Sequence, residues 1–462
     1  MRVKSRWLAL LLVLGLVLAA CGGDSGTEDD DAGTTTTTAA SGGETTTTAG
    51  ETTTTAGGEE PMEIATDFGV DLEAGVIRVG MLSDLTGPFG PLVSAILAGA
   101  QAYWDDVNAN GGIEGLEVEL VVRDTVYVVD THIQYYNEIK DDVVAIGHST
   151  GSPHTVALNA DLQADGMLAI PLTWYSGWSD SDINANLVSH GTPYCIEAMN
   201  TIGYITSEVL DGATTIAIAS LPGDYGQDSA AGAKLAAEAL GLEVVYDGEG
   251  AIIPSDESSL TTVASEIVEA QPDLAWVATT PGTFSSIFGQ ALEGYSGMWS
   301  GPSPAWSPAY VAPGSAISDA ITERFIGGTY TAGWTSEGAE AFHGLFTDAG
   351  LPVSDYYFEG VVEAKILEAA LRQAHANGDM TRQGVLDAAK SLDNVSFDGI
   401  APDESYTGAD NDRVQRQGYI YRPDPEGLAA GTSGGRMDLE AFYTSDIAAN
   451  YEFTGACYDL AG

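Results

Sequence analysis

One pentapeptide has the spacing of a catalytic nucleophile. Residues 147–151 read Gly-His-Ser-Thr-Gly, and this Gly-x-Ser-x-Gly pattern places Ser149 between a predicted strand and a predicted helix, as in the nucleophile elbow of esterases and lipases. Such an enzyme also needs a histidine late in the chain, on a loop. His343 and His375 fall in segments with helical patterns, and neither a later histidine nor a His-Gly-Gly-Gly oxyanion segment occurs. A Ser149-dependent esterase is therefore kept only as an alternative, and the chain is predicted not to be an enzyme.

Patterns that bind metals or nucleotides are incomplete. His148 and His154 lie six positions apart, but no cysteine or acidic residue joins them at the spacing of a metal site. Residues 410–412 (Asp-Asn-Asp) resemble part of a calcium loop without its glycine and closing glutamate. No Gly-x-x-x-x-Gly-Lys-Ser/Thr loop is present for nucleotide phosphates. We therefore expect no metal and no cofactor, and the residues favour binding over catalysis.

The elements that position these residues alternate between strand and helix in two series. Continuous apolar runs, typical of buried parallel strands, mark the first series at 76–82, 116–122, 143–146 and 168–170. The helices between them begin at Pro91, at Asp130 or Thr131, and at Pro153. The second series places strands at 215–219, 242–246 and 274–278, and helices at 225–240, 260–270 and 282–292. Two such series predict an α/β fold of two doubly wound lobes, rather than a single α/β barrel, with ligand-binding loops facing a central cleft.

The first residues have the pattern of a bacterial export signal. Residues 1–20 begin with three basic side chains and continue with an apolar stretch at 7–18 that is too short for a permanent membrane span. Leu18-Ala19-Ala20-Cys21 resembles the lipobox of bacterial lipoproteins, in which the cysteine is acylated. An ordinary secretory signal is the alternative. We expect lipidation at Cys21 and anchoring to the outer face of the cytoplasmic membrane.

Residues 21–74 are predicted to be a disordered tether. They contain threonine runs at 34–38, 45–48 and 52–55, separated by Gly, Ala and Glu, with no large apolar residue before Met62. Such a segment cannot bury enough surface to offset the entropy lost on ordering. A spacer of this length would hold a folded domain away from the membrane.

The composition excludes some partners. The chain carries 67 Asp and Glu against 16 Lys and Arg, a formal charge of −51 over 462 residues. Nucleic acid repels such a chain, so it is not expected as a partner. Residues 21–70 hold eleven acids and no base. Most of the negative charge therefore belongs to the predicted folded region and not to the tether.

Several segments together resemble a known family. Four segments occur in the order and spacing that type I solute-binding proteins show. They are 77–88 (Ile-Arg-Val-Gly-Met-Leu-Ser-Asp-Leu-Thr-Gly-Pro), 107–113 (Val-Asn-Ala-Asn-Gly-Gly-Ile), 145–152 (Ala-Ile-Gly-His-Ser-Thr-Gly-Ser) and 223–227 (Gly-Asp-Tyr-Gly-Gln). These leucine/isoleucine/valine-binding proteins are extracytoplasmic receptors of bacterial ABC importers. The resemblance covers about residues 76–422, and the tail after Pro423 has no counterpart in it.

The resemblance implies a periplasmic binding protein type I fold. Three hinge crossings near residues 195, 328 and 412 would join the lobes. The N-terminal lobe would comprise 75–195 plus 329–412, and the C-terminal lobe 196–328 plus 413–462. Cys195 and Cys457 remain as a pair once Cys21 is lipidated, and export favours a disulfide between them over two buried thiols.

The resemblance also implies a binding site. Gly151 and Ser152 match the positions that receive a ligand carboxylate, at the start of a helix whose dipole favours an anion. Relatives carry a glutamate for the ligand ammonium where this chain has Ser303, which argues against a typical α-amino acid. The predicted ligand-binding residues are Gly151, Ser152, Leu172, Thr173, Tyr175, Tyr225, Ser303 and Trp306.

The implied function is capture of a small amino-acid-like, amide or carboxylate solute by hinge closure. The expected partners are this small-molecule ligand and a separate ABC permease in the membrane, and the receptor itself is expected to be a monomer. A ligand sensor that delivers to a signalling partner is the second alternative, beside the esterase.

Overall fold

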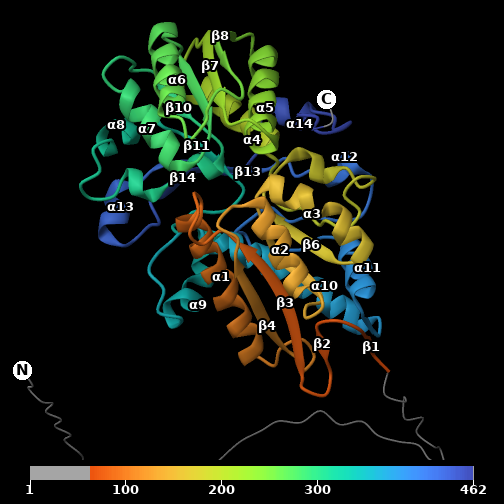
Figure 1. The fold of residues 1–462 in the computed structure, drawn as a ribbon. Helices are drawn as coiled ribbons and strands as arrows, with labels where there is room; N and C mark the ends of the chain where they lie inside the picture. Colours follow the sequence, from red (N-terminus) through yellow and green to blue (C-terminus); the bar gives the residue numbers. More distant parts are fainter. Residues whose placement is uncertain (1–62, 461–462) are drawn as a thin grey trace, which may run out of the picture. The chain divides into compact units, whose positions relative to one another are not determined.

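The first strand–helix series folds around a five-stranded sheet. The computed structural model describes residues 63–460, and Figure 1 shows their arrangement. Strands β4, β3, β5 and β6 run parallel, and the short β2 pairs antiparallel with β3. The predicted strands are confirmed with small shifts of their ends. The strands are β2 (Val70–Asp71), β3 (Val76–Ser83), β4 (Glu117–Asp124), β5 (Ala145–Thr150) and β6 (Leu168–Leu172).

Helices from two distant parts of the chain cover this sheet. The first set is α1 (Gly90–Ala109), α2 (Val129–Ile139) and α3 (Ser152–Asp165), and α10 (Tyr357–Ala376) and α11 (Arg382–Lys390) join them. Pro91 lies in the first turn of α1, as predicted, whereas no side chain caps α2, which begins one residue before the predicted Asp130. Gly99 and Gly360 allow α1 and α10 to lie in contact, because a Cβ at Gly360 would lie 1.9 Å from the carbonyl oxygen of Ile96.

The second series forms a four-stranded parallel sheet in the order β10-β9-β7-β8. β9 is buried along its whole length, as expected for the centre of such a sheet. Its strands are β7 (Thr215–Ser220), β8 (Glu243–Gly248), β9 (Leu274–Ala278) and β10 (Met298–Ser300). Its helices are α4 (Tyr194–Tyr204), α5 (Asp224–Leu240), α6 (Glu257–Ala270), α7 (Pro281–Ala291) and α8 (Ser318–Arg324).

A third, antiparallel sheet lies where the chain passes between the two parallel sheets. Its order is β11 (Gly327–Thr329), β13 (Gly418–Pro423) and β14 (Arg436–Tyr443). β13 pairs with β14, which belongs to the tail after Pro423 that the resemblance did not cover. The chain crosses three times, before α4, between β11 and α10, and between α11 and β13.

The predicted tether boundary at residue 74 is wrong. β1 (Ala65–Thr66) pairs with β12 (Asp379–Met380), and the Asp67 carboxylate accepts a hydrogen bond from the Arg382 backbone N–H at 3.0 Å. Pairing with elements from the other end of the chain orders this segment, and its own composition gives no sign of it. The predicted signal 1–20, Cys21 and the threonine runs lie outside the described residues.

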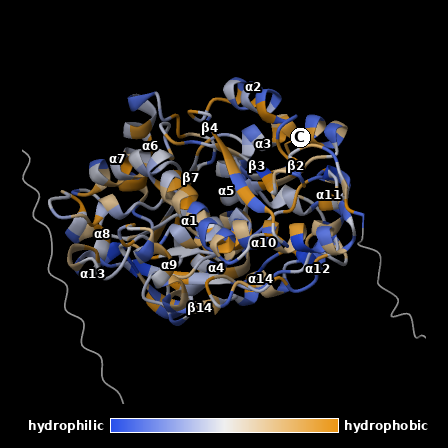
Figure 2. Cartoon of the chain, turned by 90° about the horizontal axis from the view of Figure 1, so that it is seen from below, coloured by the Kyte–Doolittle hydropathy of each residue, from blue (hydrophilic) through white to orange (hydrophobic). Residues whose placement is uncertain are grey.

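The remaining short elements are peripheral to the three sheets. They are α9 (His343–Asp348), α12 (Asp410–Arg413), α13 (Pro425–Ala430) and α14 (Asp446–Asn450). Figure 2 shows hydrophilic and hydrophobic residues side by side along α2, as expected for a helix with one buried face. No helix within residues 63–460 combines the length and the apolar character that crossing a membrane requires.

The C-terminal tail contacts both halves of the fold. A disulfide joins Cys195, on α4, to Cys457, and their Cα atoms lie 6.4 Å apart. Phe453 packs in the same cluster as Cys195, while Ala456 packs against the cluster of the first sheet that contains Trp178. The tail is thus attached to the region where the chain first crosses between the sheets.

Candidate functional site

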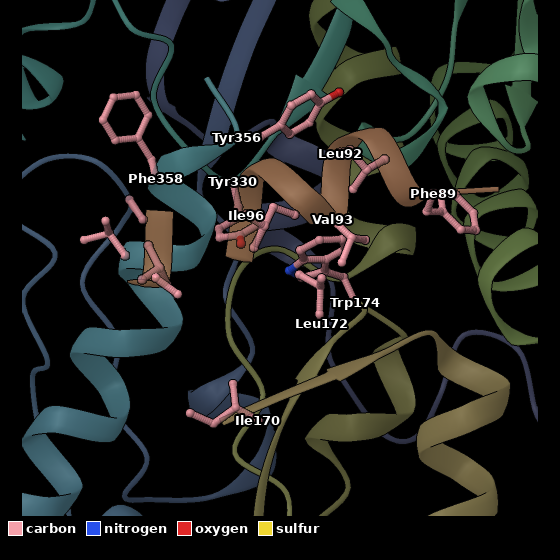
Figure 3. Packing of buried hydrophobic residues seen from close by; sticks show 14 of the residues in the cluster. Phe89, Leu92, Val93, Ile96, Ile170, Leu172, Trp174, Tyr330, Tyr356 and Phe358 are labelled. Carbon is pink, nitrogen blue, oxygen red and sulfur yellow. The ribbon is translucent and has the colours of Figure 1, made fainter. Parts of the chain in front are cut away.

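Loops at the carboxyl ends of parallel strands meet between the two sheets. In open α/β sheets this is where ligands bind. The loops enclose two neighbouring cavities, one of about 30 Å³ and one of about 680 Å³, which we call the small and the large cavity. Phe89 and Leu92, at the start of α1, line both cavities. Leu92 lies between Tyr356, which lines the large cavity, and Trp174, which lines the small one (Figure 3).

The start of α3 forms the polar part of the small cavity. Gly151 has a φ of 96°, a left-handed value that favours glycine, and Ser152 follows as the first helical residue. No side chain of the described residues caps this helix. Pro153 has no N–H and the Gly151 N–H donates to the Leu172 carbonyl, so the remaining N–H groups of the first turn and the helix dipole favour an anion at this point. The Ser152 hydroxyl is hydrogen-bonded to the Thr173 hydroxyl, which lies 3.3 Å from the Tyr194 hydroxyl.

Aromatic rings from both halves of the fold close the small cavity. The Tyr225 ring lies 4.7 Å from the Tyr194 ring and 6.4 Å from the Phe89 ring. The Tyr225 hydroxyl donates to the Thr279 carbonyl at 3.0 Å, so its proton is not free to bond to a ligand carboxylate. Of the predicted site residues, the small cavity brings together Gly151, Ser152, Leu172 and Tyr225.

Trp306 lines the large cavity, whereas Ser303 lines neither cavity and precedes Pro304, which lines the small one. The Trp306 side chain is fully buried and its carbonyl accepts from the Tyr356 hydroxyl at 3.0 Å. The Ser303 N–H donates to the Glu197 carboxyl at 2.5 Å. Burial raises the pKa of Glu197 well above its usual value. Glu197 is thus a buried acid near Ser303 that the sequence interpretation missed.

Tyr175 lines neither cavity. Its hydroxyl donates to the Tyr458 carbonyl at 2.8 Å, and its ring packs edge-on against Trp178 at 5.2 Å. The chain turns into a short 3₁₀ helix at Ser176–Ser179, so Trp174 faces the small cavity and Tyr175 points toward the C-terminal tail. Tyr127, Tyr194 and Trp174 line the small cavity without having been among the predicted site residues.

The nucleophile pattern forms a buried polar cluster. Ser149 is fully buried and lines neither cavity. Its hydroxyl lies 3.2 Å from Nε2 of His132 and 2.9 Å from the Thr155 hydroxyl. Burial lowers the pKa of His132 to about 3, and Nδ1 of His132 has no hydrogen-bond partner among the described residues. This serine–histidine pair therefore lacks both an orienting carboxylate and access from the cleft.

The lining of both cavities is uncharged. No Asp, Glu, Lys, Arg or His lines either one. A polar network lies behind Thr150, where His148 is 2.8 Å from the Thr150 hydroxyl and 2.9 Å from the Glu363 carboxylate. Burial opposes the ionisation of Glu363, but His148 and His190 outweigh it and hold the pKa of Glu363 below its usual value.

One group of possible metal ligands lies close together within the described residues. It consists of Cys195, Asp228 and Cys457, whose ligand atoms lie within 4.8 Å of one another. The two sulfur atoms are joined in the disulfide and are not free to bind an ion as thiolates.

The chain belongs to the periplasmic binding protein family, because the sequence profile of that family matches residues 76–431. The resemblance found in the sequence and the type I fold of two α/β lobes are therefore confirmed. The family consists of substrate-binding proteins, and the structural relatives belong to ABC transporters. A comparison with curated proteins finds no match.

Several solved structures share the fold. The fatty acid ABC transporter substrate-binding protein from Thermomonospora curvata is 26% identical, with a TM-score of 0.76 over 84% of this chain and 97% of that one. A branched-chain amino acid ABC transporter protein from Thermus thermophilus with bound valine is 18% identical, with a TM-score of 0.66 over 81% and 97%. A solute-binding protein from R. palustris in complex with 4-hydroxybenzoate is 15% identical, with a TM-score of 0.66 over 81% and 99%.

Proposed function

We propose that this chain is the extracytoplasmic receptor of an ABC importer and captures a small carboxylate-bearing solute by hinge closure. The observation that carries the proposal is the start of α3, with Ser152 and uncapped N–H groups, which opens into an uncharged cavity between the two halves of the fold. A helix N-terminus in a site sheltered from water binds an anion through its N–H groups and dipole. Closure is favoured because the ligand contacts both lobes only in the closed state.

A cationic or zwitterionic solute fits the site less well. The cavities have no charged lining residue, and Ser303 stands where relatives carry an acid. The nearby Glu197 is already bonded to the Ser303 N–H, and burial disfavours its ionised form. An ammonium group placed here would have no ionised partner and would be costly to bury. The fatty acid named for the 26% identical relative also carries a carboxylate and no ammonium group.

Delivery to the transporter completes the proposal. The receptor is exported by the signal at 1–20, acylated at Cys21 and held by residues 21–62 outside the cytoplasmic membrane, where it acts as a monomer and docks on a separate permease. A Cys21→Ser variant should appear in the soluble extracytoplasmic fraction, while the unchanged protein should stay with the membrane. Equal membrane retention of both would contradict the lipid anchor.

Calorimetric titration of the purified protein tests the ligand class. Butanoate, benzoate and 4-hydroxybenzoate are compared with the corresponding amides and with butylamine, in parallel with thermal unfolding. Carboxylates should stabilise the folded state by a free energy of RT ln(1 + [L]/Kd) and so raise the melting temperature, whereas amines should not. Stabilisation by butylamine, with none by any carboxylate, would refute the proposal.

A further inference from the structure

We propose that the ligand is an elongated monocarboxylate whose apolar chain occupies the large cavity while its carboxylate lies at the start of α3. This inference rests on the proposed function and adds the class of substrate. The small cavity measures about 30 Å³, which is room for about two water molecules, so it admits a headgroup and not a whole solute. The body of the ligand must therefore lie elsewhere.

The large cavity is the adjacent space. Phe89 and Leu92 line both cavities, so the two spaces adjoin at these side chains, and a ligand that extends past them from the α3 region would reach the large cavity. Its volume of about 680 Å³ lies within the range of pockets that enclose whole small-molecule ligands. It lies between the start of α1 and the start of α7, so a ligand in it touches both lobes.

The large cavity offers no charged partner to a second charged end of the ligand. None of its lining residues is charged, although the chain carries 67 acidic residues. The hydroxyl protons of the two tyrosines of its wall are already used. Tyr310 shares its single hydroxyl proton between the carbonyl oxygens of Pro281 and Ala305, each 2.6 Å from the hydroxyl oxygen, and Tyr356 donates to the Trp306 carbonyl. Four serines also line the cavity, but the tyrosine rings, Leu92, Ile317 and the prolines make its surface more apolar than polar.

Gly282 offers a way to fill this cavity without disturbing the fold. It lines the large cavity in the first turn of α7, and a Cβ added there would meet no atom within 4 Å. Gly289 lies on the same helix outside both cavities, and a Cβ there would meet only a methyl group of Ile317 at 3.9 Å. Gly282→Phe and Gly289→Phe therefore change the helix alike but differ in whether they occupy the cavity.

Calorimetric titration with butanoate, hexanoate, octanoate and decanoate tests the inference, with octan-1-ol as the ligand that lacks a carboxylate. The dissociation constant should fall about fourfold per added methylene, which corresponds to about 0.8 kcal/mol for each methylene buried. In Gly282→Phe, decanoate should lose at least about tenfold in affinity while butanoate changes less than about twofold. Gly289→Phe should bind the whole series as the unchanged protein does.

The outcomes separate this inference from the proposed function. If butanoate binds and longer acids bind no more tightly, or if Gly282→Phe weakens butanoate as much as decanoate, the inference fails and the function stands. If octan-1-ol binds as tightly as octanoate, or no acid of the series binds, the carboxylate site itself fails. Ser285→Phe, which also projects from α7 into the large cavity, serves as the second variant should Gly282→Phe not fold.

Discussion

Ser152 is the residue on which ligand affinity should depend most directly. Its hydroxyl lies at the first position of α3 and is hydrogen-bonded to Thr173. We expect Ser152→Ala to weaken carboxylate binding about tenfold or more, because a hydrogen bond to a charged group contributes about 1.5–3 kcal/mol. Titration calorimetry with the tightest-binding acid measures the change.

Ser286→Ala is the control for this substitution, because Ser286 lies on α7 outside both cavities. It should leave the dissociation constant unchanged. Equal affinity in Ser152→Ala and the unchanged protein would show that the α3 hydroxyl does not contact the ligand.

A second prediction at the scale of one residue concerns the ionisation of Asp228. It is fully buried, its carboxyl accepts from the Ser176 backbone N–H at 3.1 Å and from the Ser176 hydroxyl, and burial raises its pKa to about 7. The folded state thus holds this proton more tightly than the unfolded state does. The resulting stabilisation is fully present below about pH 4 and is lost as the pH rises to about 7.

Asp228→Asn removes this titration while keeping a similar shape. The difference in unfolding free energy between the variant and the unchanged protein should therefore shift in favour of the variant from pH 5 to pH 8, as measured by urea unfolding. Asp273→Asn is the control, because hydrogen bonds from Thr214 and Thr215 lower the pKa of Asp273 and leave it ionised over this range. A difference for Asp228→Asn that stays constant with pH would contradict the prediction.

At the scale of elements, local patterns predicted what local residues determine. The apolar runs and the proline and glycine positions located the strands of both parallel sheets and most of their helices, because those signals act within a few residues. The pairing of β1 with β12 and of β13 with β14 joins segments without a local signal of their own. For that reason the tether boundary and the end of the second lobe could not be read from the sequence.

In the candidate site, too, some residues could be predicted from the sequence and others could not. Gly151, Ser152 and Leu172 lie at or just after strand ends and were predicted from the family resemblance, whereas Tyr127 was not predicted. It lies in the small cavity because Val126 and Tyr127 both adopt a left-handed backbone, with φ of 55° and 53°, where no glycine marks such a turn. Tyr175 was assigned to the site because it falls near a predicted binding loop, and the direction of its side chain depends on the turn that follows it.

The contact of α1 with α10 gives a prediction about an element. Gly360→Ala would place a methyl group against the backbone of α1, since its Cβ position lies 1.9 Å from the Ile96 oxygen and 2.7 Å from the Ala100 nitrogen. We expect a loss of about 1–3 kcal/mol in the free energy of unfolding, as overpacking typically causes. Urea unfolding measures it.

Gly344→Ala on α9 is the matched control, because a Cβ there meets nothing within 4 Å. It should be neutral or stabilise the protein by up to about 1 kcal/mol, the helix preference of alanine over glycine. A Gly360→Ala protein as stable as the control would mean that α10 shifts freely against α1.

At the scale of the whole molecule, charge and binding are separated in space. The formal charge is −51, yet the two cavities are uncharged, and buried acids such as Glu197 and Glu363 lie behind their walls. Exposed acids keep the chain soluble and lie in water, where screening limits their effect on the cleft. The overall acidity therefore gives no reason to expect a cationic ligand.

The C-terminal tail gives the last prediction, again for the whole molecule. The Cys195–Cys457 disulfide closes a loop of 262 residues, the Cys457 N–H donates to the Ser176 hydroxyl at 2.8 Å, and Phe453 and Ala456 pack on opposite halves of the fold. Without the disulfide, the unfolded chain gains conformational freedom and the tail loses its attachment. We expect Cys457→Ser to lower the free energy of unfolding by about 2–5 kcal/mol.

Limited proteolysis followed by mass spectrometry should then show cleavage within 444–460 before any cleavage of the sheets. Dithiothreitol should reproduce both effects in the unchanged protein and add nothing to Cys457→Ser, which separates loss of the disulfide from other effects of the substitution. Two free thiols in the denatured, unreduced protein would contradict the disulfide. A tail that stays protected after reduction would show that its packing alone holds it across the lobes.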